Sequence, residues 1–263
     1  MRNLRLAFIN IKKNFLNARE LKSAFIISII GMFINNFSFT FLWLYFGKSV
    51  GVLNGWSPTD IFGLYAISGI SYGFVCAFLY GLFNIPSYIS SGNFDKFLIT
   101  PKNTLVKVVT SSISTSAIGD LLFGVMCFIL FIVFSHLSLF QIFVMLFFTF
   151  LSIIIFFSFS LVCMSISFYL MDGENVSNGI YGMFVSASLY HGGAFTGILR
   201  VIFVFLVPSL LLGAVPVEII KNFSIVKCLI LLLFSILWLI ISICFFYRSI
   251  RRYESNSFFG FGG

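Results

Sequence analysis

The stretch from Ile225 to Tyr247 reads IVKCLILLLFSILWLIISICFFY and carries a single charge, at Lys227. A bilayer's hydrocarbon core, about 30 Å thick, requires about 20 apolar residues of helix to cross it. The stretch therefore predicts a transmembrane helix. Four further stretches meet the same length, and these are Ser23 to Phe46, Ile61 to Phe83, Val108 to Phe134 and Leu139 to Leu170. A sixth, Val176 to Val217, is long but broken.

The composition agrees with a membrane protein. Apolar residues make up 60% of the chain and charged residues 9%, and the mean hydropathy is +1.09. Lipid offers no partner for unpaired backbone groups, so an open-ended spanning segment must be helical. The sequence lacks the alternating pattern of a membrane barrel. We therefore predict an all-α membrane protein that forms one domain over residues 1–263.

Positive charge predicts the orientation of the spans. Lys and Arg mark the cytoplasmic side of a membrane protein. They gather in the first 22 residues and again after the last span, at Arg2, Arg5, Lys12, Lys13, Arg19, Lys22, Arg248, Arg251 and Arg252. Both termini are therefore expected in the cytoplasm, which requires an even number of crossings. We predict six spans, the fifth from about Val176 to Arg200.

Residues 201–221 are expected to form a re-entrant pair of short helices before the last span. Pro208, Gly213 and Pro216 interrupt this region, and proline and glycine break helices. Broken backbone at membrane depth is tolerated where protein or a watery cavity covers it.

Residues 1–22 are expected to form an interfacial helix, because apolar residues alternate with cations there. The alternative is an unstructured basic tail. No small-residue cleavage site follows the first apolar run, so the segment is not expected to be a removable signal peptide. The net charge of +8 is attributed to orientation and to anionic lipid headgroups, and no nucleic-acid partner is expected. The five cysteines are scattered through the spans and predict neither disulfides nor a metal site.

Two enzyme-like motifs occur in unsuitable contexts. Gly47, Lys48 and Ser49 spell the end of a phosphate-binding loop, but Leu42 stands where its first glycine is required. Residues 69–73 spell G-x-S-x-G without the strand-turn-helix context of a hydrolase. Small residues in a span favour close helix packing, and the alternative is a Ser71 nucleophile with His191 or His136 as base. No catalytic, cofactor-binding or metal-binding residues are expected.

Asp120 is the one carboxylate well inside a predicted span, and buried charge in a membrane suggests a function or a partner. It follows a run of hydroxyl residues from Thr110 to Ser116. One interpretation is an ion or proton site; the favoured one is a structural carboxylate, bonded to those hydroxyls or to a neighbouring subunit. Asp120 and His191 are the candidate pathway residues.

The loop from Asn84 to Lys107 reads NIPSYISSGNFDKFLITPKNTLVK and mixes apolar with polar residues. Such a segment can lie under the membrane and dock on a soluble partner, and the alternative is that it packs only on headgroups and its own spans. The candidate docking residues are Gly92, Phe94, Asp95, Lys96, Phe97, Leu98 and Pro101.

The order of these elements resembles the six-span permease subunits of type-2 ABC exporters. In one branch of that family the loop commonly reads G-x-x-D-x-x-L-x-x-P and the C-terminal end R-R-Y-x-S. Gly92, Asp95, Leu98 and Pro101 match the first pattern, and Arg251, Arg252, Tyr253 and Ser255 match the second. The resemblance covers essentially the whole chain. One departure is Tyr190-His191-Gly192, where that branch often has Tyr-Pro.

The resemblance implies a transport permease at the cell membrane whose energy comes from separate ATP-binding subunits. ATP would bind on those partners, and this chain would hold no cofactor. A second permease subunit, identical or similar, would complete the path, and the loop 84–107 would act as a coupling helix. The 38 phenylalanines suit efflux of a hydrophobic or amphipathic cargo such as a peptide, lipid or drug. The alternative is an ion- or proton-coupled secondary transporter that uses Asp120.

Overall fold

The computed structural model describes residues 2–20, 22–50, 54–99, 101–170, 172–190 and 192–253. All regular structure in these ranges is helical, as predicted. Five helical segments are long and apolar enough to cross a membrane, namely Lys22–Tyr45, Asp60–Ser90, Ala117–Phe134, Leu139–Phe168 and Ile225–Ile250. Each overlaps one of the five unbroken stretches of the sequence.

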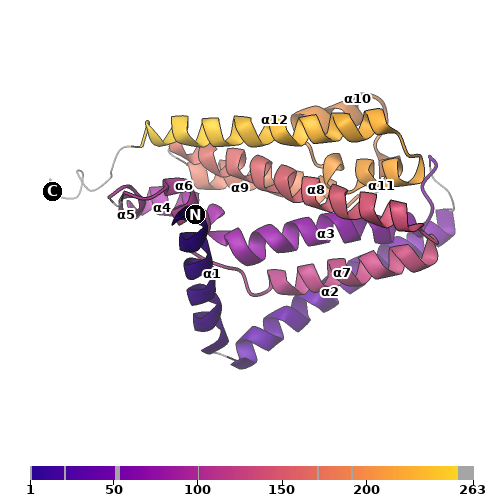
Figure 1. Cartoon of the computed structure of the whole chain (residues 1–263), viewed down its shortest axis with the longest axis horizontal. Helices are drawn as coiled ribbons and strands as arrows, with labels where there is room; N and C mark the ends of the chain where they lie inside the picture. Colours follow the sequence, from indigo (N-terminus) through magenta and orange to yellow (C-terminus); the bar gives the residue numbers. More distant parts are fainter. Residues whose placement is uncertain are drawn as a thin grey trace.

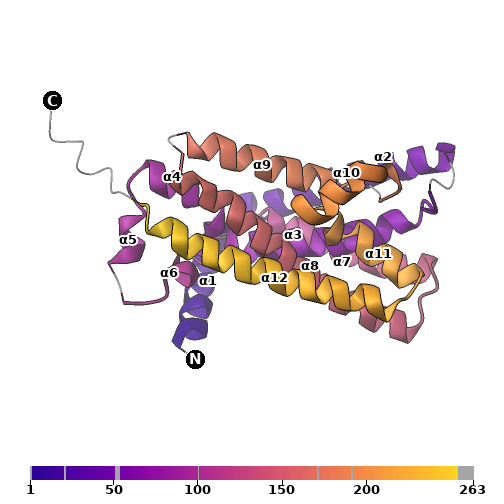
Figure 2. The ribbon, with the colours of Figure 1, turned by 90° about the horizontal axis from the view of Figure 1, so that it is seen from above.

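The long helices form one bundle (Figure 1). Helices α3 (Asp60–Leu79), α7 (Ala117–Phe134), α8 (Leu139–Ser165) and α12 (Ile225–Ile250) lie side by side. Helix α2 (Lys22–Val50) crosses this layer diagonally and packs on α7. Helix α9 (Gly173–Ser188) packs on α8, as the view in Figure 2 shows.

Glycines bring α3 and α7 into close contact. A Cβ added at Gly73 would lie 2.5 Å from the backbone nitrogen of Leu121, and one at Gly124 would lie 2.7 Å from that of Ile70. The expectation that the G-x-S-x-G residues serve helix packing is thus met. The Ser71 hydroxyl is buried and donates to the Ile67 carbonyl within its own helix.

The third span begins later than predicted. Helix α6 (Thr104–Val109) ends before the hydroxyl-rich run, and α7 starts at Ala117. The run bonds to other segments: the Asn10 amide donates to the Thr110 hydroxyl (3.0 Å), and the Ser114 N–H donates to the Cys76 carbonyl (3.0 Å). These bonds tie the run to α1 and α3, so Val108 to Phe134 is not one continuous helix.

Helix α1 (Arg2–Glu20) runs across the long axis of the bundle (Figure 1). Besides Asn10, its Asn14 amide donates to the Thr110 carbonyl at 3.1 Å. Leu4 and Phe8 are exposed. A helix at this angle with bare apolar side chains suits the predicted place at the membrane interface, which stays a prediction.

The broken region 192–224 turns back on itself. After α9 come η3 (Gly192–Ala194), α10 (Gly197–Val201), η4 (Ile202–Leu206), η5 (Leu210–Leu212) and α11 (Ala214–Lys221). Arg200 forms an ion pair with Glu218, so segment 197–221 leaves and returns at the same end of the bundle. The re-entrant pair of helices in the membrane stays a prediction. The helix α9 ends at Ser188 and has 16 residues, so a sixth span stays a prediction.

Candidate functional site

The loop 84–107 folds into three short helices at the end of the bundle near α1 (Figure 1). They are α4 (Ile85–Ser90), α5 (Asp95–Leu98) and α6. Gly92 has φ +69° in the turn between α4 and α5, a conformation that glycine adopts without steric cost. The Phe94 N–H closes this turn by donating to the Tyr88 carbonyl at 3.0 Å.

Two of the candidate docking residues are buried within the chain. Phe94 has no exposed surface and Phe97 is 7% exposed. The Phe94 ring lies 5.1 Å from the ring of Phe168 and 5.2 Å from that of Tyr253. Phe94 therefore packs the loop against the bundle, and the docking role expected of both phenylalanines stays a prediction.

We name residues 95–99 the loop tip, and its exposed side chains are those of Lys96, Leu98 and Ile99. Leu98 is 42% exposed and Ile99 is 79% exposed. Lys96 is exposed as well, and its ammonium lies 4.4 Å from the centre of the Tyr88 ring. Asp95 is half-buried, and Pro101 lies exposed beyond the tip. The loop tip thus joins two bare apolar side chains to charged groups of both signs.

Tyrosines at the end of α12 fasten the loop to the bundle. The Tyr253 hydroxyl donates to the Gly92 carbonyl at 3.3 Å, and the Tyr247 hydroxyl donates to Asn103 Oδ1 at 3.0 Å. Sequence reasoning placed Tyr253 in a terminal motif without a structural role, because a contact between positions so far apart leaves no local signal.

Lys107 links two parts of the loop, because its ammonium donates a hydrogen bond to the Phe97 carbonyl. Burial, and then the charge of Lys102, lower the pKa of Lys107 from its usual value.

Beside the loop, a polar cavity of about 470 Å³ lies between α4, the start of α9 and the end of α12, lined in part by Asp172, Glu174 and Arg252.

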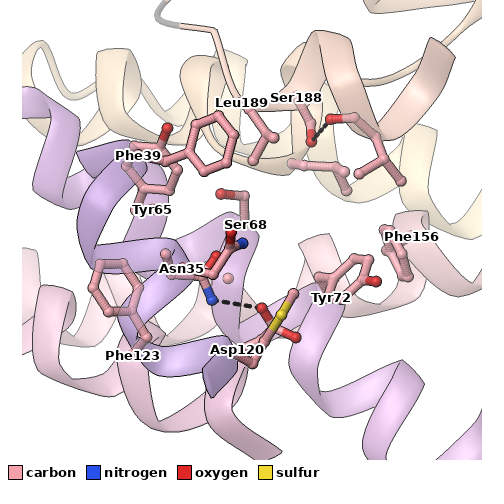
Figure 3. Close-up of a pocket in the computed structure, with 15 residues that line it drawn as sticks. Asn35, Phe39, Tyr65, Ser68, Tyr72, Asp120, Phe123, Phe156, Ser188 and Leu189 are labelled. Carbon is pink, nitrogen blue, oxygen red and sulfur yellow. Dashed lines mark hydrogen bonds between the residues drawn. The ribbon is translucent and has the colours of Figure 1, made fainter. Parts of the chain in front are cut away.

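A second cavity, of about 150 Å³, lies within the bundle between α2, α3, α7 and α9 (Figure 3). Asp120 lines it and is 5% exposed. The Asn36 amide donates to Asp120 Oδ1 at 2.6 Å. The partner of the Asp120 side chain is thus an amide on α2, and none of the side-chain bonds of Asp120 among the described residues goes to the hydroxyl-rich run. Asn36 was missed because its contact with Asp120 joins two different helices.

The other candidate pathway residue, His191, lies outside the described residues. His136, the second candidate base, follows the end of α7. Among the described residues no group of three or more His, Cys, Asp or Glu side chains could hold a metal ion. The five cysteines are all free.

A bundle of long apolar helices, with a mostly apolar cavity inside it and a loop bonded to one end, defines a multi-pass membrane protein. Residues 24–257 match the model of the ABC-2 family transporter proteins, so the chain belongs to this family. Neither a comparison with curated proteins nor one with solved structures gave a match.

Proposed function

We propose that the chain is the transmembrane subunit of an ATP-driven exporter for a hydrophobic or amphipathic cargo. ATP binds and is hydrolysed on a separate subunit, and a second permease subunit, identical or similar, completes the path. The membership in the ABC-2 family carries this proposal. Both termini lie in the cytoplasm, in keeping with the cations at the two ends of the chain.

The loop tip is the contact with the ATPase. It lies at the same end of the bundle as α1 and the end of α12, where the cytoplasmic cations gather. Buried apolar anchors usually dominate the energy of an interface, and Leu98 and Ile99 are the bare apolar side chains of this tip. Tyr253, Tyr247 and the buried phenylalanines would pass a movement of the tip to the helices.

A rigid element with two positions is what such coupling requires. The three short helices of the loop are joined to α12 by the two tyrosine bonds and to α8 through η2 (Ile166–Phe168) by the Phe94–Phe168 contact. The loop therefore moves with the bundle as one piece. The family match does not favour the alternative, an ion-coupled secondary transporter.

The test is purification of the tagged chain from its own membranes, followed by measurement of the ATPase activity that accompanies it. The double variant Leu98→Ala/Ile99→Ala is expected to insert normally and to retain much less ATPase. Leu139→Ala is a matched control, because Leu139 is 77% exposed at the other end of the bundle. Full ATPase retention by the double variant would exclude the loop tip as the contact, and the absence of any bound ATPase from wild type would exclude the proposed function.

A further inference from the structure

The cavity in the bundle has a composition that points to a ligand. Its walls are mostly apolar and aromatic, with Phe39, Tyr65, Tyr72, Phe123 and Phe156 among them. Asp120 is the one carboxylate among the described lining residues, and none of these is Lys, Arg or His. The cavity therefore combines aromatic faces with a negative charge that no cation of its described walls balances.

Asp120 has unused bonding capacity inside this cavity. Its Oδ1 accepts the Asn36 amide, whereas Oδ2 is buried and has no hydrogen-bond partner among the described residues. A buried carboxylate that is left without a counter-charge is costly. The Tyr65 hydroxyl, which also borders the cavity, is likewise buried without a partner in the described part of the chain. Figure 3 shows both side chains at the cavity.

We propose that this cavity binds the cationic head of a lipophilic ammonium compound, with Asp120 as the counter-ion. The Oδ2 atom pairs with the ammonium, and the aromatic faces attract the cation through their quadrupoles. A cavity of about 150 Å³ accommodates a benzene-sized group, which fits one ring or one alkylated ammonium. The proposal rests on the proposed function only in taking the bound compound as cargo.

The position of the cavity suits an amphipathic ligand. Met32, Asn35, Asn36 and Phe39 of α2 form one wall, and the neighbouring α2 side chains Ile27, Ile30 and Ile34 are exposed on the outside of the bundle. A ligand whose head lies at Asp120 can place its apolar part along α2. The small volume limits the enclosed part to the head.

The test uses two molecules of nearly equal shape, phenyltrimethylammonium and tert-butylbenzene, of which only the first is charged. Equilibrium dialysis with the whole protein in lipid nanodiscs measures the binding of each. We expect saturable binding of the cation and about tenfold weaker binding after Asp120→Asn, because the substitution removes the counter-charge of a buried ion pair. Ser188→Ala is the matched control: Ser188 also borders the cavity, but its hydroxyl donates to the Val185 carbonyl of its own helix.

Equal binding of the two molecules to wild type would overturn the proposal, even if Asp120→Asn fails to fold. Unchanged cation binding in a folded Asp120→Asn variant would do so as well. Displacement of the organic cation by millimolar sodium would also overturn it, by making the cavity an inorganic-ion site. This binding assay needs no ATPase, so its failure is separate from a failure of the ATPase purification.

Discussion

The hydroxyl of Tyr253 donates a hydrogen bond to the carbonyl oxygen of Gly92 at 3.3 Å, although the two residues are 161 positions apart in the sequence. Gly92 belongs to the loop pattern and Tyr253 to the terminal pattern through which the chain resembles type-2 ABC permeases. The contact brings one residue of each pattern together. The hydrogen bond from Tyr253 holds the turn at Gly92 against the C-terminal end of the bundle.

Replacement of Tyr253 tests this closure. Tyr253→Phe removes one hydrogen bond and keeps the ring against Phe94, so the free energy of unfolding is expected to fall by about 1 kcal/mol. Tyr253→Ala also removes the ring contact and is expected to cost more. Denaturant titration of the purified protein measures both. Equal effects of the two variants would show that the ring contributes nothing.

Gly92 is expected to resist substitution for conformational reasons alone. No atom lies within 4 Å of a Cβ at this position, but φ is +69°, so Gly92→Ala should cost about 1–2 kcal/mol of stability. Gly179→Ala in α9 is the matched control, because it has equal space and an ordinary helical φ. That control should be neutral or slightly stabilising. Comparison of the two melting temperatures decides the point.

The glycine contact between α3 and α7 predicts a steric effect. Gly73→Ala forces a methyl group against the backbone of Leu121 and should destabilise the protein by about 1–3 kcal/mol. Ser71→Ala, two residues away, should leave transport intact because its hydroxyl donates to the Ile67 carbonyl of the same helix. Loss of activity in Ser71→Ala with normal folding would instead revive a hydrolase function.

Phe97 and Ile99 are expected to behave in opposite ways. Phe97→Ala empties a buried position and should cost about 3–5 kcal/mol of stability, so less folded protein reaches the membrane. Ile99→Ala should leave the yield unchanged and weaken ATPase binding, since 79% of its side chain is exposed. Membrane yield and ATPase pull-down, measured side by side, distinguish a folding role from a binding role.

The proposed orientation is open to chemical labelling. In a variant whose five native cysteines are replaced, Asn93→Cys beside the loop tip and Asn222→Cys after α11 should react with an impermeant maleimide from opposite sides. Asn222 should react from outside intact cells, and Asn93 only after permeabilisation. Labelling of Asn222→Cys from the cytoplasm alone would contradict both the topology and the re-entrant hairpin.

The contribution of the ion pair between Lys221 and Asp60 to the free energy of unfolding can be predicted. Lys221 Nζ lies 2.6 Å from Asp60 Oδ2, and the carboxylate is 3% exposed. Lys221→Ala leaves that buried carboxylate with the Ser57 N–H and should cost about 1–3 kcal/mol. Lys227→Ala is the control, because Lys227 is exposed and forms no ion pair within the described ranges. It should leave the free energy of unfolding nearly unchanged. Denaturant titration distinguishes the two.

Hydropathy predicted the five long helices because apolar length is a property of neighbouring residues. It failed at Thr110 to Ser116, where hydropathy cannot reveal that the hydroxyls and backbone bond to α1 and α3 instead of continuing a helix. Its proline and glycine residues allowed the loop to be predicted. The burial of Phe94 could not be predicted, because it depends on contacts with Phe168 and Tyr253, which are remote in sequence. The role of Asn36 was not predicted for the same reason, because its partner Asp120 lies on another helix.

The close glycine contact of α3 with α7 has a mechanical consequence. The loop 84–107 links these two helices, and Gly73 and Gly124 leave no room for sliding between them. A force on the loop is therefore expected to move α3 and α7 together as one rigid pair. Relative movement is instead expected where α2 borders the cavity of Asp120, because no glycine contact of this kind is described between α2 and α3.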